Sequence, residues 1–266
     1  MIKIGPAPHI AVDVEGSGPL VVFIHGIGGN RTNWVDQLPV FAEHFTAVAM
    51  DLRGYGDSDD YQGSLHFPDF SEDVLKVIDH FGVAQALLVG LSMGGRGALD
   101  FFGHYPERLA SMVLADTTGG LRGPPSPAQV REFLQTRQRP LLEGKTPEDI
   151  APDVTNVLVG PSTTPETRAR IERSIAALHT QSYLKTLEAA VWYEGYPDYT
   201  TITIPTLLIV GEEDTVAKPD VMERIASYIP GARLERIAKA SHMSNLDQPE
   251  AFNRLVLDFL KEQVSV

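Results

Sequence analysis

The sequence predicts an α/β fold with a mostly parallel central sheet, helices on both of its faces and a helical lid insertion. Short, continuous apolar runs recur along the chain, which is typical of strands that are buried on both faces. Between these runs, apolar residues lie three and four positions apart, as expected of amphipathic crossover helices. From about residue 121 to residue 201, the chain contains helical patterns and no convincing strand.

The first half of the chain alternates predicted strands with predicted helices. The strands are expected at Ile2–Ile4, His9–Val14, Leu20–His25, Thr46–Met50, Ala86–Leu91 and Ser111–Ala115. The helices are expected at Asn33–His44, Phe67–Gly82 and Met93–Tyr105. In the second helix, Phe70, Val74, Val77 and Phe81 form one apolar stripe, and Gly82 ends the helix.

The second half begins with the proline-rich segment LRGPPSP at 121–127. Helical patterns follow near Gln129–Gln138, Glu166–His179 and Tyr183–Tyr193. Strands are expected again at Thr206–Val210 and Arg233–Ile237, and a last helix at Pro249–Lys261. We therefore expect a core domain built from residues 1–120 and 202–266, with residues 121–201 inserted as a helical lid.

Composition excludes several classes of protein. The 266 residues include 22 basic and 35 acidic side chains, for a formal charge of −13, and no dense basic run is present. Nucleic acid is therefore not an expected partner. No apolar run is long enough to span a membrane, and the N-terminus lacks the pattern of a signal peptide. We expect a cytoplasmic protein, a monomer or small homo-oligomer, that acts on a small-molecule substrate.

The sequence also argues against metal and cofactor chemistry. The chain has no cysteine, so disulfides, a catalytic thiol and thiolate metal sites are excluded. No His-Glu-x-x-His pattern is present, and the glycine-rich segment GIGGN lacks the lysine and the Ser/Thr of a phosphate-binding loop. We expect no metal and no cofactor.

The strongest motif is Gly90–Gly94, which reads GLSMG and lies between a predicted buried strand and a predicted helix. This G-x-S-x-G pattern places a serine on a sharp strand-to-helix turn. Side chains two residues before and after the serine would crowd that turn, so glycine is required at both positions. Ser92 is therefore the candidate nucleophile.

Two backbone N–H groups are candidates for an oxyanion hole. One belongs to Met93, which directly follows Ser92 at the start of a helix, where the helix dipole favours negative charge. The second is expected from the loop after the strand Leu20–His25, and we select Ile27 between two glycines. We interpret His25 as a structural support of this loop.

The base and its acid partner are expected after the serine in the chain, the acid first and the histidine second. Of the eight histidines, His242 fits best, because it lies in a loop between the last predicted strand and the last predicted helix. Asp214 and Asp116 both directly follow predicted strands and are both candidates for the acid. We favour Asp214, because a strand followed by Gly-x-x-Asp is the commoner arrangement.

With these residues assembled, the chain resembles the α/β-hydrolase superfamily over nearly its whole length. The segments that carry the resemblance are HGIGGN, DLRGYGDS, GLSMGGR, YPERLASMVLADT, IPTLLIVGEEDTV and ASHMSNLDQPEAF. They are most similar to bacterial 3-oxoadipate enol-lactonases, small carboxylesterases and cofactor-free haloperoxidase-like members. The resemblance implies the α/β-hydrolase fold and hydrolysis of a carboxylic ester or lactone through Ser92, His242 and Asp214.

Related activities stay open. The carbon–carbon hydrolases of meta-cleavage pathways share the triad, and a lyase of the menaquinone pathway has an arginine like Arg96, although it usually has tyrosine where this chain has Leu91. Haloalkane dehalogenases and epoxide hydrolases use an aspartate in place of Ser92. After ester or lactone hydrolysis and the carbon–carbon hydrolase or lyase reactions, the third class of function that stays open is a non-catalytic ligand receptor.

Substrate contacts are expected in the lid. Trp192 and Tyr193 belong to an aromatic cluster that is a candidate for the substrate-binding wall, although packing of the lid on the core explains it equally well. Four arginines of the insertion are candidates for binding a substrate carboxylate or, alternatively, form a solvated face: Arg122, Arg131, Arg168 and Arg170.

Overall fold

The structure is a computed structural model, which describes residues 1–119 and 126–264. One eight-stranded sheet forms its centre, in the order β1-β2-β4-β3-β5-β6-β7-β8. The strands are β1 (Ile2–Ile4), β2 (Ile10–Glu15), β3 (Leu20–Ile24), β4 (Thr46–Met50), β5 (Ala86–Leu91), β6 (Leu109–Ala115), β7 (Thr206–Gly211) and β8 (Arg233–Ile237). β1 and β2 pair antiparallel, as do β2 and β4, whereas every pair from β4 to β8 is parallel. The predicted, mostly parallel sheet is confirmed.

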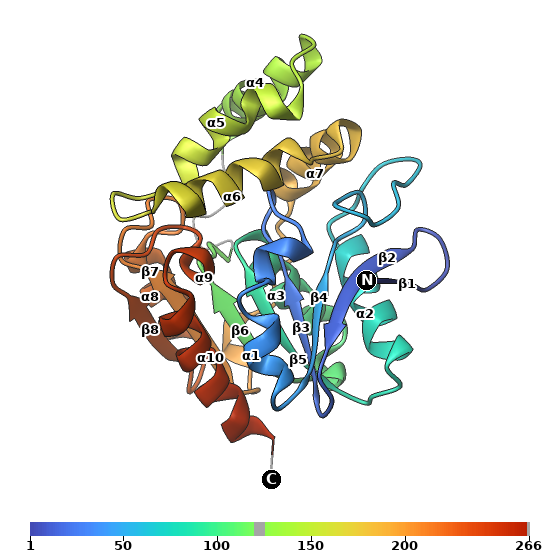
Figure 1. Cartoon of the computed structure of the whole chain (residues 1–266), viewed down its shortest axis with the longest axis vertical. Helices are drawn as coiled ribbons and strands as arrows, with labels where there is room; N and C mark the ends of the chain where they lie inside the picture. Colours follow the sequence, from blue (N-terminus) through green and yellow to red (C-terminus); the bar gives the residue numbers. More distant parts are fainter. Residues whose placement is uncertain (120–125, 265–266) are drawn as a thin grey trace.

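Helices cover both faces of the sheet (Figure 1). α1 (Leu38–Ala42) and α10 (Pro249–Gln263) contact each other on one face, and α2 (Asp69–His80) and α3 (Met93–His104) contact each other on the opposite face. α8 (Pro219–Tyr228) packs on β7 and β8. Every residue of β3 and of β5 is buried, as expected for strands covered on both sides. Burial of each large aliphatic side chain there contributes about 1.5–3 kcal/mol to the stability of the fold.

Four helices form an insertion between β6 and β7, above the carboxyl ends of the parallel strands (Figure 1). They are α4 (Pro127–Leu142), α5 (Pro147–Leu158), α6 (Pro165–Ala176) and α7 (Thr180–Trp192). The first three begin alike: Ser126, Thr146 or Thr164 caps the helix through its hydroxyl, and proline occupies the next position. The cap accepts a bond from an N–H that has no partner within the helix, and proline has no N–H to satisfy.

The helical insertion is thus confirmed, but its entry is not described. Most of the proline-rich segment 121–127, the expected boundary at residue 121 and Arg122 lie outside the described residues. The division into a core domain and a lid domain remains a prediction. Within the described residues, no helix is long and apolar enough to cross a bilayer.

Some predicted helices differ from the observed ones. The predicted helix Asn33–His44 is instead a short 3-10 helix, η1 (Arg31–Trp34), followed by α1. Pro39, the second residue of α1, has no N–H to donate to the carbonyl group four residues earlier, which favours a break between the two helices at this point. Sequence patterns also did not predict α5, which contains Pro152 in its interior, or α8.

Candidate active site

Ser92 lies at the sharp turn between β5 and α3 with φ of 55° and ψ of −114°, a backbone conformation that is strained for a residue with a side chain. Its N–H donates to the Ala115 carbonyl at 2.8 Å, which ties the turn to β6. The flanking glycines leave no room for a side chain. A Cβ at Gly90 would lie 2.3 Å from the Gly94 oxygen, and a Cβ at Gly94 would lie 2.2 Å from the Ile24 oxygen. Glycine at both positions is therefore a steric requirement of the turn.

The Ser92 hydroxyl, the His242 ring and the Asp214 carboxylate form one hydrogen-bonded line. The Ser92 Oγ lies 2.8 Å from His242 Nε2, and His242 Nδ1 lies 2.8 Å from Asp214 Oδ2. Because an ionised carboxylate can only accept, Nδ1 of a neutral ring donates to Asp214, and Nε2 is left to accept the serine proton. The other Asp214 oxygen, Oδ1, accepts from the N–H groups of Val216 and Ala217, which fixes the carboxylate.

Asp116, the other candidate for the acid, has different partners. Its Oδ1 accepts from the Gly211 N–H at 2.9 Å, and its Oδ2 accepts from the Ser244 hydroxyl at 2.6 Å. It therefore connects the end of β7 to the start of α9 (Ser244–Asp247), next to His242. Complete burial, and then the negative charge of Asp214, raise the pKa of Asp116. The structure assigns the histidine contact to Asp214 and a bracing position to Asp116.

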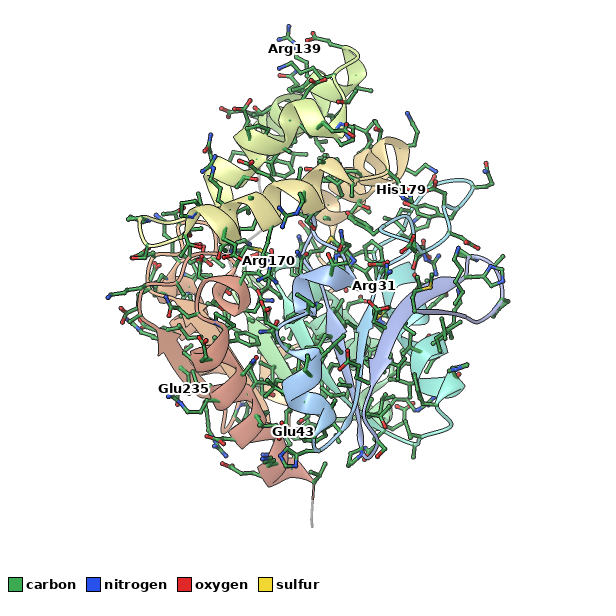
Figure 2. The ribbon with its side chains drawn as sticks, viewed as in Figure 1. Arg31, Glu43, Arg139, Arg170, His179 and Glu235 are labelled. Atoms are coloured by element: carbon green, nitrogen blue, oxygen red, sulfur yellow. The ribbon has the colours of Figure 1, made fainter. Side chains whose placement is uncertain are left out.

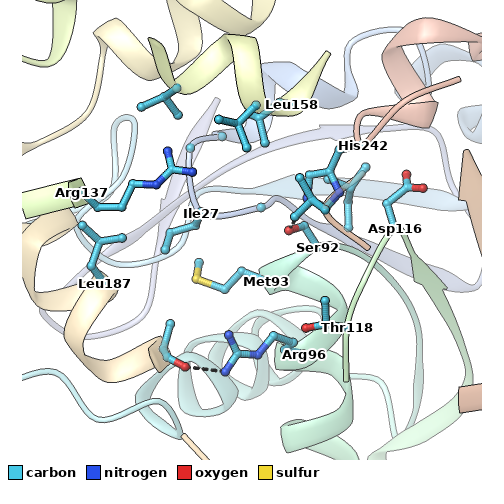
Figure 3. Close-up of a pocket in the computed structure, with 18 of the residues that line it drawn as sticks. Ile27, Ser92, Met93, Arg96, Asp116, Thr118, Arg137, Leu158, Leu187 and His242 are labelled. Atoms are coloured by element: carbon cyan, nitrogen blue, oxygen red, sulfur yellow. Dashed lines mark hydrogen bonds between the residues drawn. The ribbon is translucent and has the colours of Figure 1, made fainter. Parts of the chain in front are cut away.

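The two residues expected to supply oxyanion donors line the same cavity as Ser92. Ile27 and Met93 both line the cavity in front of the serine (Figure 3). Among the hydrogen bonds of residues 1–119 and 126–264, none uses the backbone N–H of either residue. The loop that carries Ile27 lies against the serine, since a Cβ at Gly26 would be 3.2 Å from the Ser92 Cβ. Among the described residues, both N–H groups therefore have no hydrogen-bond partner, as the prediction requires.

His25 holds this loop in place. Its Nδ1 donates to the Gly26 carbonyl at 2.7 Å, and its Nε2 accepts from the Leu52 N–H at 3.1 Å. Both ring nitrogens are engaged only if the ring is neutral, and burial lowers the pKa of His25 accordingly. The histidine therefore connects the glycine loop to the end of β4.

A cavity of about 760 Å³ opens in front of Ser92, between the core and the insertion. Such a volume suits a small-molecule ligand. The core contributes the loop after β3 and the start of α3, and all four insertion helices contribute side chains. The apolar part of the wall includes Val154, Leu158, Ile171, Leu187 and Val191.

Of the two aromatic residues that were candidates for substrate binding, one lines the cavity and the other does not. Tyr193 lines the cavity, but its hydroxyl lies within hydrogen-bond distance of two acceptors, the Asp100 carboxylate and the Gly195 carbonyl, and donates its one proton there. Its ring stacks on Phe67 at 4.2 Å between centroids. Trp192 is 58% exposed and is not among the residues that line the cavity.

The arginines of the insertion also have different positions. Arg168 pairs with Glu172 on its own helix, Arg170 pairs with Asp36 of the core at 2.7 Å, and Arg131 is exposed. Figure 2 shows Arg170 on the side of α6 that faces the core. None of the three lines the cavity, whereas Arg137, which the sequence analysis did not single out, does.

Arg96 of α3 also lines the cavity, but its guanidinium is already bound. It donates to the Tyr196 hydroxyl and to the Ala190 carbonyl, and it stacks over the Phe67 ring. These contacts connect α3 to the end of the insertion. Within residues 1–119 and 126–264, no group of three or more His, Asp or Glu side chains is arranged to hold a metal ion.

Comparison with known proteins supplies a family and several relatives. A family model described as alpha/beta hydrolase fold matches residues 19–249. The chain is 29% identical to 3-oxoadipate enol-lactonase 2 of Acinetobacter baylyi, over 93% of this chain and 90% of the enzyme. It is 31% identical to a 2-hydroxy-6-oxononadienedioate/2-hydroxy-6-oxononatrienedioate hydrolase of Burkholderia vietnamiensis, over 98% and 94% of the two chains. A thermophilic esterase from Thermogutta terrifontis, solved with malate bound, superposes with a TM-score of 0.89 at 28% identity, over 99% of each chain.

Proposed function

The chain belongs to the α/β-hydrolase fold family, and from this premise we propose that it is a serine hydrolase that cleaves a carboxylic ester or lactone. Ser92 is the nucleophile, His242 the general base and Asp214 the residue that orients the histidine. The observation that carries the proposal is the hydrogen-bonded line from the Ser92 hydroxyl through His242 to Asp214, next to a cavity of small-molecule size.

The reaction follows from this geometry in two halves. As the Ser92 oxygen attacks the carbonyl carbon, His242 Nε2 takes the hydroxyl proton, and Asp214 stabilises the charged ring. The N–H groups of Ile27 and Met93 bind the oxyanion that develops. The histidine then gives its proton to the departing alkoxide, which leaves an acyl group on Ser92. A water molecule, activated by the same histidine, releases the acid and restores the serine.

A second candidate is hydrolysis of a carbon–carbon bond. It is favoured by the 31% identity to the oxononadienedioate hydrolase, which extends over nearly the whole of both chains. The two reactions share the serine and the histidine and differ in the leaving group, which is an alkoxide in one and a carbanion in the other. The oxoadipate enol-lactonase and the esterase among the relatives support the ester or lactone reaction.

A substrate panel tests the proposal. Wild type and Ser92→Ala are assayed with p-nitrophenyl butyrate, an enol-lactone and a meta-cleavage diketo acid. We expect turnover of the ester or the lactone by wild type, and a loss of several orders of magnitude in Ser92→Ala. Turnover of the diketo acid alone would favour carbon–carbon hydrolysis. Retention of wild-type ester hydrolysis in Ser92→Ala would refute the proposal.

A further inference from the structure

One cationic side chain of the cavity, Arg137, has no hydrogen-bond or ion-pair partner among the described residues. Helix α4 directs Gln129, Phe133 and Arg137 into the cavity, and their spacing of four residues places them on one face of the helix. Figure 3 shows the Arg137 guanidinium directed into the cavity, across from Ser92 and His242.

Unlike Arg137, the next two residues of α4 have hydrogen-bond or ion-pair partners. Gln138 donates to the Leu184 carbonyl and to Glu188, and Arg139 pairs with Glu143 on the outer surface. Figure 2 shows Arg139 at the end of the insertion that lies farthest from the core. For Arg137, no hydrogen bond and no carboxylate oxygen within 4.0 Å are found in the described part of the chain.

The two acidic residues of the cavity wall, Asp116 and Glu194, do not neutralise the charge of Arg137. Asp116 accepts hydrogen bonds from Gly211 and Ser244. Glu194 is exposed and forms no ion pair with an arginine of the described chain. Arg137 is half-buried in a cavity whose wall is mostly apolar. A guanidinium in such surroundings lacks part of its hydration, so a bound anion gains more there than it would at an exposed arginine.

A hydrogen-bond donor lies close to Arg137. Tyr183 of α7 lines the same cavity, and no hydrogen bond of its hydroxyl is found within residues 1–119 and 126–264. Burial raises the pKa of Tyr183, with the positive charge of Arg137 acting in the opposite direction. The hydroxyl therefore stays protonated at neutral pH and can donate. A planar fork of N–H groups with an O–H nearby suits the two oxygens of a carboxylate.

We propose that Arg137, assisted by the Tyr183 hydroxyl, binds a free carboxylate of the substrate, so that the protein prefers anionic esters or lactones that are themselves acids. This inference rests on the proposed function, since it places the ester carbonyl at Ser92 and the carboxylate at the opposite wall of the cavity. The overall charge of −13 repels such substrates, and a local cation at the binding site offsets that repulsion.

The carboxylate can belong to the acyl half or to the alcohol half of the ester, and matched substrates distinguish the two. Mono-p-nitrophenyl adipate carries it on the acyl half and is compared with p-nitrophenyl hexanoate. 4-Carboxyphenyl hexanoate carries it on the alcohol half and is compared with phenyl hexanoate. We expect wild type to prefer the anionic member of at least one pair, mainly through a lower KM.

The variants are Arg137→Gln and, as a matched control two residues away, Arg139→Gln. We expect Arg137→Gln to lower kcat/KM for the preferred anionic ester by about tenfold to a hundredfold, the range for hydrogen bonds to charged groups. Turnover of its neutral counterpart is expected to change less than threefold, and Arg139→Gln to leave both unchanged. Equal losses on the anionic and the neutral ester, or equal effects of the two variants, would overturn the inference.

A binding measurement separates this inference from the proposed function. Adipate is titrated into wild type, Arg137→Gln and Arg139→Gln and followed by calorimetry, with circular dichroism to verify folding. We expect adipate to bind wild type and Arg139→Gln at least tenfold more tightly than Arg137→Gln. If Ser92-dependent ester hydrolysis is found but adipate binding does not depend on Arg137, the proposed function stands and the inference fails. If adipate binding depends on Arg137 but no ester is cleaved, the carboxylate site stands and the proposed reaction fails.

Discussion

The Nε2 atom of His242 lies 2.8 Å from the Ser92 hydroxyl, although 150 positions separate the two residues in the chain. Parallel strands bring them together, because the loops after β5 and β8 both leave the carboxyl edge of the sheet. The helical insertion lies above this edge (Figure 1), and its side chains form part of the cavity wall.

The two aspartates next to His242 are expected to respond differently to amide substitution. Asp214→Asn replaces the acceptor of His242 Nδ1 by an amide that favours the wrong tautomer, so we expect kcat to fall by about 10⁴-fold with little change in stability. Asp116→Asn is expected to lower kcat less than tenfold. A crippled Asp116→Asn and a nearly normal Asp214→Asn would reverse the two assignments.

Asp116→Asn is expected to act mainly on folding. Both carboxylate oxygens accept hydrogen bonds from Gly211 and Ser244, and an amide can accept at only one of its two ends. The unmatched N–H of a buried donor costs about 1–3 kcal/mol. Urea unfolding of wild type and Asp116→Asn measures this difference, and equal stabilities would show that the bracing contact is unimportant.

Two glycines of α3, Gly94 and Gly97, are expected to differ in their tolerance of a side chain. A Cβ at Gly94 would lie 2.2 Å from the Ile24 oxygen, whereas a Cβ at Gly97 would have no neighbour within 4 Å. We expect Gly94→Ala to lose activity and about 1–3 kcal/mol of stability or more through overpacking. Gly97→Ala, the matched control, is expected to gain about 0.5–1 kcal/mol from helix propensity. Urea unfolding and ester turnover measure both effects, and equal behaviour of the two variants would contradict the steric account.

Tyr193 is expected to be a structural residue as much as a substrate contact. Its hydroxyl donates to the buried carboxylate of Asp100, and Tyr193→Phe leaves that carboxylate with one donor fewer. We expect a loss of about 1–3 kcal/mol of stability, with kcat changed less than threefold. Trp192→Ala, at the exposed neighbouring position, is expected to change neither quantity. Thermal unfolding and ester turnover of both variants test this, and an unchanged stability of Tyr193→Phe would argue against the structural role.

Sequence patterns predicted the sheet and the residues at the carboxyl ends of its strands more fully than they predicted the cavity wall. The turn at Ser92 was recognisable because it requires glycine two residues before and two residues after the serine, a constraint that is local in the chain. Arg137 carries no such signal: it is one of several arginines on amphipathic helices, and only the packing of α4 against α7 decides which of them faces inward. Helix α5 was missed because Pro152 is unfavourable in a helix interior.

His25 predicts a pH dependence of stability. Burial lowers its pKa in the folded state below the ordinary value of 6.5, so the unfolded chain binds a proton that the folded chain does not. The stability contributed by neutral His25 is therefore complete above pH 6.5 and is lost as the pH falls below it. Between pH 7.5 and 5.5 we expect wild type to lose about 1 kcal/mol more than His25→Gln in urea unfolding. Parallel losses in the two proteins would contradict this.

The central claim is that Ser92 is the nucleophile, and covalent labelling tests it most directly. Wild type and Ser92→Ala are treated with a fluorophosphonate, and intact mass and peptide mapping locate the adduct while ester turnover is recorded. The proposed mechanism predicts one adduct per wild-type chain, on Ser92, with turnover lost in proportion, and no adduct on Ser92→Ala. An unlabelled wild-type protein, or a label on another residue that abolishes turnover, would contradict it.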